Sequence, residues 1–209
     1  MTIKKVLLIG CCLLVNLLIV RCSTRLAGVE TTNGCTVVAT ATSIEGMAPP
    51  LSRVFIFDTS YIPYIDSGVG IGTATDDEGA FQFNTPPGNY HIFIVGPTGE
   101  AAGIAIKSPD AAHVGAVSKE QQLQPPGAVS GTISTEASDT LLVFLAGMCH
   151  YQLITAAGNF YLTNVPEGVY SLKIARVSGP QNGPVMEILH ERLVSVNKGD
   201  TTVIGEIRF

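Results

Sequence analysis

The chain contains no tryptophan and is poor in charged residues, which make up 14% of its 209 positions. Basic residues are the scarcer kind, with 12 Lys and Arg against 17 Asp and Glu. Three of them, Lys4, Lys5 and Arg21, lie in the N-terminal segment, which leaves nine basic against 17 acidic residues in the rest of the chain, a net charge near −8. An acidic surface repels phosphate groups. Nucleic acid is therefore not an expected partner.

The spacings that mark common catalytic and metal sites are also missing. The four histidines form no H-E-x-x-H pair, and the chain has no G-x-S-x-G turn and no C-x-x-C pair. Glu187 and His190 are three residues apart in a strand-like run, where they would face opposite sides. The carboxylates of residues 76–78 lack the further ligands of a calcium loop, and we expect them at a hairpin tip. We therefore predict no catalytic residue, no metal and no cofactor, in a protein that is not an enzyme.

The N-terminus has the pattern of an export signal. Lys4 and Lys5 precede an apolar run over residues 6–20. As a helix with a rise of about 1.5 Å per residue, this run would span roughly 22 Å. The hydrocarbon core of a bilayer is about 30 Å thick, and a helix needs ~20 residues to cross it. A cleaved signal peptide over residues 1–21 is therefore preferred to a permanent transmembrane helix.

Cys22 follows the apolar run within the sequence Ile-Val-Arg-Cys-Ser, which resembles a bacterial lipoprotein signal. In such signals the cysteine becomes the lipidated first residue of the mature protein. Arg21 departs from the pattern, which has a small residue before the cysteine, so an uncleaved anchor and ordinary secretion stay open. The resemblance implies that a lipid on Cys22 anchors the chain to a membrane of the cell envelope, with the bacterial outer membrane as the expected place. Residues 22–33 then form a flexible tether.

Two further cysteines, Cys35 and Cys149, lie beyond the tether. They are 114 positions apart and fall in different predicted domains. An oxidising compartment permits a disulfide between them, but the sequence does not show that they approach within bonding distance. Two small buried or half-buried thiols are the favoured interpretation.

The rest of the chain has the composition of an all-β protein. Val, Ile, Thr and Gly are abundant, and short apolar runs alternate with Pro-rich and Gly-rich turns. The first series of predicted strands covers residues 35–42, 53–58, 70–75, 80–84, 89–95, 101–106 and 114–123. The second series covers residues 128–135, 141–145, 149–155, 159–162, 169–177, 185–196 and 201–208. Strands at this spacing are typical of a sandwich or barrel.

The two series share a repeated motif. The first has T-D-D-E-G-A-F-Q-F from Thr75 and P-P-G-N-Y-H-I from Pro86, and the second has T-A-A-G-N-F-Y-L from Thr155 and P-E-G-V-Y-S-L from Pro166. An internal repeat outranks any local motif in predicting the fold. We therefore predict two tandem β-sandwich domains, residues 34–124 and 125–209.

The repeated residue types have mechanical roles. Gly79 and Gly158 are expected in hairpin turns with positive φ, which costs other residues more. The apolar residues alternate along each strand, so one face is predicted to be buried. His91 alternates with its apolar neighbours and is expected to face outward. The residues expected to face inward are Phe81, Phe83, Tyr90, Ile92, Ile94, Phe160, Leu162, Tyr170, Leu172 and Ile174.

This repeated pattern is similar to the signature of carboxypeptidase regulatory-like domains, roughly T-D-x-x-G-x-F-x-F followed by P-x-G-x-Y-x-L. The resemblance covers nearly all of residues 34–209 and is more specific in the first copy. It implies transthyretin-like (prealbumin-like) seven-stranded sandwiches, related to the starch-binding-like fold. The motif specifies a fold and names no reaction.

A possible ligand-binding surface lies in the longest loop of the first series, between the strands that end at residue 58 and begin at residue 70. Tyr61, Tyr64 and Asp66 combine two aromatic rings with a carboxylate, a set that suits sugar binding. The loop could equally fold back and pack over a sandwich, which is the favoured alternative.

These observations together predict a non-catalytic lipoprotein of the cell envelope. Its two β-sandwich modules would serve a structural or adhesive interaction, with carbohydrate or another envelope protein as the expected partner. The alternative is a carbohydrate-binding accessory lipoprotein that uses Tyr61, Tyr64 and Asp66.

Overall fold

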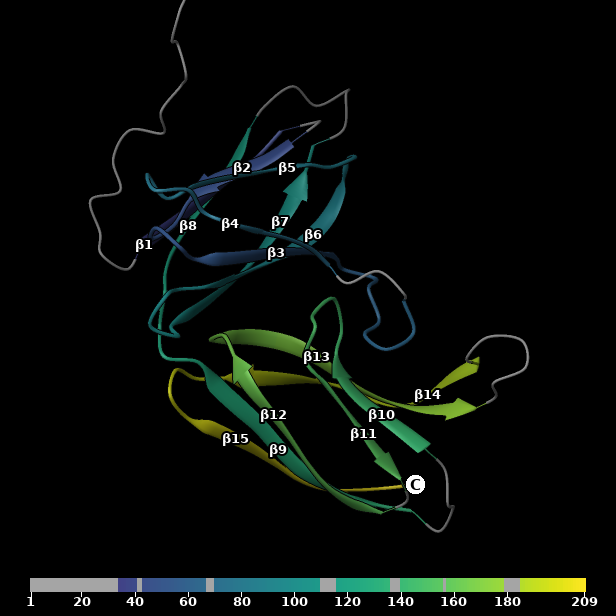
Figure 1. The fold of residues 1–209 in the computed structure, drawn as a ribbon. Helices are drawn as coiled ribbons and strands as arrows, with labels where there is room; N and C mark the ends of the chain where they lie inside the picture. Colours follow the sequence, from purple (N-terminus) through teal and green to yellow (C-terminus); the bar gives the residue numbers. More distant parts are fainter. Residues whose placement is uncertain are drawn as a thin grey trace, which may run out of the picture.

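A computed structural model describes residues 34–40, 43–66, 70–109, 116–135, 140–155, 157–178 and 185–209. All regular elements of this part are β-strands arranged in sandwiches, which confirms the all-β prediction (Figure 1). Within the same part there is no helix of the length and apolarity needed to cross a bilayer. The predicted signal helix, the tether and Cys22 lie outside the described residues.

The first sandwich consists of two four-stranded sheets. One sheet has the order β5-β2-β1-β8 and the other the order β4-β3-β6-β7. The strands are β1 (Gly34–Ala39), β2 (Ser43–Met47), β3 (Arg53–Asp58), β4 (Ile71–Ala74), β5 (Ala80–Asn84), β6 (Gly88–Val95), β7 (Ala101–Ser108) and β8 (Val117–Gln122). Their facing side chains form one buried cluster, which includes Phe81, Phe83, Tyr90 and Ile92.

The second sandwich has a three-stranded sheet, β12-β9-β15, and a four-stranded sheet, β11-β10-β13-β14. The strands are β9 (Gly127–Ser134), β10 (Thr140–Leu145), β11 (Tyr151–Thr155), β12 (Gly158–Val165), β13 (Gly168–Ser178), β14 (Val185–Val196) and β15 (Thr201–Arg208). The predicted inward-facing residues of both copies are all buried, so the alternating pattern identified the core faces correctly. In Figure 1 the first sandwich is coloured purple to teal and the second green to yellow.

The two sandwiches share one topology with a single difference. The order β4-β3-β6-β7 in the first is repeated strand for strand as β11-β10-β13-β14 in the second. In the other sheet, the β1–β2 hairpin of the first sandwich is replaced by the single strand β9. Because this sheet has one strand fewer, its last strand lies beside a neighbour that runs in the same direction. The last strand β15 therefore pairs parallel with β9, whereas β8 pairs antiparallel with β1.

Strand β2 is absent from the sequence prediction, which places one strand over residues 35–42. No strand is predicted over Ser43–Met47, a short segment that contains Gly46, a residue type depleted in strands. In the sheet, Gly46 lies opposite Phe81, and a Cβ there would lie 2.7 Å from the Phe81 ring. The glycine therefore makes room for an aromatic ring that only the folded sheet brings near.

The P-x-G-x-Y motif acts as the same structural device in both sandwiches. The Tyr90 hydroxyl donates a hydrogen bond to the Pro86 carbonyl (2.8 Å), and the Tyr170 hydroxyl donates one to the Pro166 carbonyl (3.0 Å). The ring lies over the glycine of the motif, and a Cβ on that glycine would approach the tyrosine to 3.1 Å in the first copy and 3.0 Å in the second. The repeat therefore encodes a tyrosine that closes the turn before its own strand.

The other repeated glycine differs between the copies. Gly79 has a φ of 85°, as expected, and follows an Asp76 side chain that accepts hydrogen bonds from the backbone of Glu78 and Ala80. The prediction is wrong for Gly158, which does not have a positive φ. The second turn carries Ala where the first has Asp76 and Asp77, so the side-chain acceptor that organises the first turn is missing.

We expect Tyr170→Phe to lower the free energy of unfolding by about 1 kcal/mol, because the variant leaves the Pro166 carbonyl without its donor in a buried site. Tyr90→Phe should have a similar effect. Tyr161→Phe is the control, since the Tyr161 hydroxyl contacts Thr201 at the exposed surface, and its unfolding should stay within about 0.5 kcal/mol of the parent. Urea denaturation measures all three, and equal stabilities would contradict a structural role for the motif.

Candidate functional site

Part of the outer face of the β4-β3-β6-β7 sheet is apolar and buried, although it lies outside the core of its own sandwich. Phe93 points to this face and is 5% exposed. Its ring stacks on Phe55 with centroids 6.1 Å apart, and Phe55 in turn lies 6.5 Å from Phe57. These rings belong to the same buried cluster as the core of the second sandwich. The two sandwiches therefore meet through a continuous apolar contact, which we call the joint.

The second sandwich covers this face with the turn between β10 and β11, residues 146–150. Met148 is 1% exposed within the shared cluster. The His150 ring packs edge-on against Phe93 at 5.1 Å. Gly103, on the same outer face, approaches Tyr170 and Pro166 so closely that a Cβ would lie 2.7 Å from the Tyr170 hydroxyl. The joint thus combines aromatic packing with close backbone approach.

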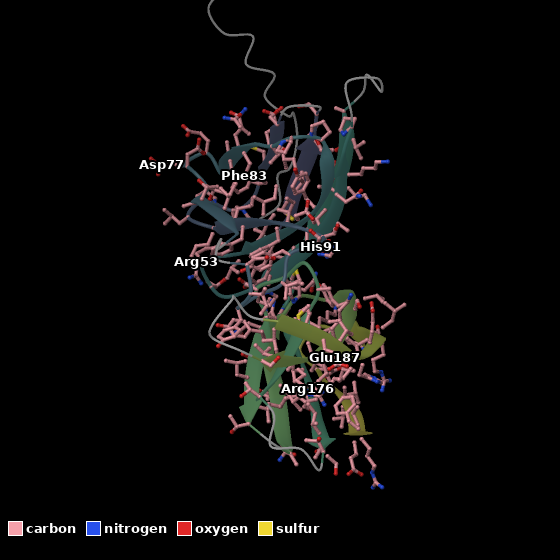
Figure 2. The ribbon with its side chains drawn as sticks, turned by 90° about the vertical axis from the view of Figure 1, so that its right-hand side faces the viewer. Arg53, Asp77, Phe83, His91, Arg176 and Glu187 are labelled. Carbon is pink, nitrogen blue, oxygen red and sulfur yellow. The ribbon has the colours of Figure 1, made fainter. Side chains whose placement is uncertain are left out.

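His91 faces away from the core of its sandwich, as the alternation predicts, but it does not face solvent alone. Its Nδ1 lies 3.1 Å from the Gly147 carbonyl of the second sandwich. Because a carbonyl only accepts, this contact assigns the proton to Nδ1. Figure 2 shows His91 at the end of the first sandwich that adjoins the second.

Gly147 is the point of closest approach in the joint. Its φ is 68°, a conformation that favours glycine. Its N–H donates to the Tyr61 carbonyl (3.0 Å), and a Cβ would lie 2.5 Å from Nδ1 of His91 and 3.1 Å from Cα of Thr59. A larger residue at this position requires the His91 ring and the backbone at Thr59 to shift.

His150 is a half-buried titratable group of the joint. Its Nε2 donates to the Asn164 carbonyl (2.9 Å), while its Nδ1 is buried and has no hydrogen-bond partner in the described part of the chain. Burial lowers the pKa of His150 below 6.5, and the bond to Asn164 offsets only part of this effect. The neutral imidazole is therefore the form that the joint accommodates.

The loop after β3, residues 59–66, crosses from the first sandwich to the second, and we call it the clasp loop (Figure 1). Tyr61 packs on Phe57 with ring centroids 5.0 Å apart. Ile62 and Ile65 pack on a second apolar cluster, formed on the outer face of β10 and β13 by Leu142, Phe144 and Ala175. The clasp loop thus covers a face that the second sandwich would otherwise expose.

The clasp loop is held in shape by Asp66. Its Oδ2 accepts a hydrogen bond from the Ile62 N–H (2.7 Å), and the Asp66 N–H donates to the Ile62 carbonyl (3.0 Å). Tyr64, between the two isoleucines, has a φ of 72° and lies at the surface. Its ring lies 6.3 Å from that of Tyr151, which comes from the second sandwich.

The three predicted ligand residues therefore occupy three different environments. Tyr61 is half-buried in the joint, and burial raises its pKa, with further contributions from Cys149, Asp66 and Tyr151. Asp66 shapes the loop through one carboxylate oxygen, and Tyr64 alone presents its ring to solvent. The loop packs, as the favoured alternative expects, but mainly onto the second sandwich rather than back over its own.

The sequence alone does not identify several residues of the joint. Gly147, His150 and Tyr151 lie far along the chain from the clasp loop and fit no motif. One indication is present in the run Ile92-Phe93-Ile94, where an apolar residue interrupts the expected alternation. Apolar residues at successive positions predict a strand buried on both faces.

A cleft of 170 Å³ lies beside the joint. It is lined by His91, Gly103, Ile104, Ala105, Met148, Gly168, Val169 and Tyr170. Pockets for small molecules usually measure roughly 300–1,000 Å³. The cleft is too small to bury a ligand of that class.

The two cysteines stay free and belong to different sandwiches. The Cys35 thiol is buried, donates to the Gln121 carbonyl (3.1 Å), and has its pKa raised to about 12 by burial. It is therefore a poor nucleophile near neutral pH. Cys149 is exposed beside the joint. Among the described residues no three or more His, Cys, Asp or Glu side chains are grouped to hold a metal ion.

Two solved structures show a low similarity to the chain. One is titled "Biofilm associated protein - BSP domain", with 11% identity and a TM-score of 0.28, over 76% of this chain and 28% of that one. The other is titled "The Bacillus anthracis TIE protein", with 14% identity and a TM-score of 0.29, over 87% of this chain and 41% of that one. The chain therefore spans less than half the length of either structure.

No protein-family model and no curated protein matches the chain. Membership of the carboxypeptidase regulatory-like family stays a prediction, which rests on the repeated motif.

We expect Gly147→Ala to destabilise the protein more than Gly199→Ala. The two glycines have nearly the same φ, 68° and 70°, but Gly199 has no atom within 4 Å of a Cβ. Both variants should lose about 1 kcal/mol from the left-handed conformation, and Gly147→Ala should lose a further ~1–3 kcal/mol from the clash in the joint. Urea denaturation measures the difference, and equal losses would show that Gly147 is not confined by the joint.

We expect stability to fall when the pH is lowered from 7.5 to 5.5. The unfolded chain protonates His150 near pH 6.5, whereas the folded chain keeps it neutral, so below this pH the unfolded state binds more protons. The loss begins near pH 6.5 and levels off below the lowered pKa of the folded state. His150→Gln, which keeps a side-chain donor, should reduce this dependence. An unchanged slope of unfolding free energy against pH in the variant would contradict the assignment.

Proposed function

We propose that the chain is a non-catalytic lipoprotein of the cell envelope that presents two β-sandwich modules, docked to each other, for a structural or adhesive interaction. The observation that carries this proposal is the joint. Aromatic residues on the outer face of the first sandwich pack against the second, and the clasp loop covers an apolar face of β10 and β13. A chain that uses its longest loop to lock two domains together is suited to hold a surface at a fixed geometry.

The chemistry of the described residues supports a role without catalysis. Burial favours the neutral form of three titratable groups, since it lowers the pKa of His150 and raises that of Tyr61 in the joint, and it raises that of Cys35 in the core of the first sandwich. Desolvation is the largest cause of each of these shifts. Catalytic sites more often pair such a group with a charge or a second titratable group in a cleft.

The export half of the proposal rests on residues 1–22 of the sequence, with Cys22 as the attachment point of the lipid. The short apolar run and the two lysines before it favour cleavage of the signal peptide. Two acyl chains or one chain with a second signal are needed for stable anchoring. A tether of residues 22–33 would then separate the first strand from the membrane.

We expect the intact mass of the mature protein to correspond to residues 22–209 carrying a covalent lipid. Cys22→Ala should remove the lipid and release the protein from the membrane fraction. Cys11→Ala is the matched control, because Cys11 lies within the apolar run and leaves with the signal peptide. Its mature mass and membrane association should equal those of the parent. A mature chain with an unmodified Cys22 would overturn the lipid anchor.

A further inference from the structure

Apart from Tyr61, which packs in the joint, the tyrosines of the chain divide into two groups by what their hydroxyls contact. Tyr90 and Tyr170 donate to proline carbonyls in the cores, and the exposed Tyr161 contacts the Thr201 hydroxyl. Tyr64 and Tyr151 are 52% and 46% exposed, and neither hydroxyl makes a hydrogen bond within the described part of the chain. These two side chains therefore present both an aromatic ring and an unused hydroxyl to solvent.

Tyr64 and Tyr151 come from different sandwiches and form one surface. Their ring centroids are 6.3 Å apart and the ring planes are tilted by 43°. Tyr151 lies opposite Phe144 in the β10–β11 ladder and so shares its outer face, on which the clasp loop packs. Leu153, two residues further on the same face, is also exposed. The pair exists only while the two sandwiches are docked.

Tyr64 is held in this position at an energetic cost. A bulky residue with a φ of 72° is strained by about 1–2 kcal/mol. The strain persists because the loop is anchored on both sides of Tyr64, by the packing of Ile62 and Ile65 and by the hydrogen bonds between Ile62 and Asp66. These anchors turn the ring away from the core. A ring that is both strained and fixed in solvent is pre-organised for contact with a ligand.

The size of the surface restricts the kind of partner. A buried aromatic side chain covers 150–250 Å², so two half-exposed rings offer roughly 200 Å². A stable protein interface needs about 800 Å² on each side. The patch matches a sugar unit or two more closely than a protein surface.

The chemistry of the surface restricts the partner further. Sugar rings have apolar faces that pack on aromatic rings, and hydroxyls that bond to phenol and carboxylate groups. Asp66 is exposed, and its Oδ1 makes no hydrogen bond in the described part of the chain. The acidic residue and the acidic chain as a whole disfavour uronate or sulfate groups.

We propose that Tyr64 and Tyr151 form a composite binding site for a neutral saccharide chain, assembled by docking of the two sandwiches, with Asp66 as a hydrogen-bond acceptor at its side. This inference rests on the proposed adhesive function and names the ligand class of its surface. It differs from a site on the clasp loop alone, since Tyr151 replaces Tyr61 as the second ring.

The test is binding of the purified, fluorescently labelled protein to an array of neutral and uronate-containing oligosaccharides. We expect binding to at least one neutral oligosaccharide. Tyr64→Ala and Tyr151→Ala should each weaken it by roughly tenfold. Tyr161→Ala is the matched control, because Tyr161 is 53% exposed but lies outside the patch, and it should bind as the parent does. Binding to none of the neutral oligosaccharides, binding to uronates alone, or equal binding by all variants would overturn the proposal.

A second measurement tests whether the site needs both sandwiches. Gly147→Ala disturbs the joint without touching either ring, so it should weaken binding of the same oligosaccharide, whereas Gly199→Ala should not. Binding that is lost with Tyr64→Ala but unchanged by Tyr151→Ala and Gly147→Ala would place the site on the loop alone and overturn the composite site. Failure on the array, with a lipid found on Cys22, would leave the envelope role intact. An unmodified Cys22 together with glycan binding would overturn the lipid anchor and leave the saccharide site intact.

Discussion

The contact between the two sandwiches is the constraint on which the rest of the structure depends. Phe57 and Phe93 lie on the outer face of a sheet whose other face already forms a core. Leaving such rings in water would cost about 2–3 kcal/mol each, so this face requires a cover. The second sandwich supplies it through the turn at Gly147, and the clasp loop covers an apolar face in return. Each sandwich thus completes the burial that the other lacks.

This mutual burial explains why the loop after β3 is long. Its residues have to cross to the second sandwich, anchor Ile62 and Ile65 there, and return to β4. The same crossing fixes Tyr64 beside Tyr151 and sets the Tyr61 carbonyl against the Gly147 N–H. One short segment therefore packs Tyr61, Ile62 and Ile65 inward and turns Tyr64 outward.

The repeat and its exception have a common physical origin. The tyrosine of each P-x-G-x-Y motif bonds to a carbonyl four residues earlier, so the motif is local and survives in both copies. The opening hairpin of the first sandwich is not local in this sense, since β2 pairs with β5 almost 40 residues later. The second copy lacks this hairpin. Because β15 pairs parallel with β9, each remaining strand of the sheet still runs in the direction of its counterpart in the first copy.

The sequence by itself determined the all-β class, the repeat and the faces that form each core, because these depend on a two-residue alternation and on turns of a few residues. It did not reveal strand β2, whose Gly46 makes room for Phe81, or the turn at Gly158, where no acidic side chain organises the backbone. For the site, the sequence selected the clasp loop and Tyr64 but grouped them with Tyr61 and Asp66. Only the tertiary structure separated Tyr61 from Tyr64 and brought Tyr151 and His150 to the same region. The reason is that docking of two folded faces depends on shape and on residues far apart in the sequence, such as Tyr64 with Tyr151 and Phe93 with His150, which local patterns do not encode.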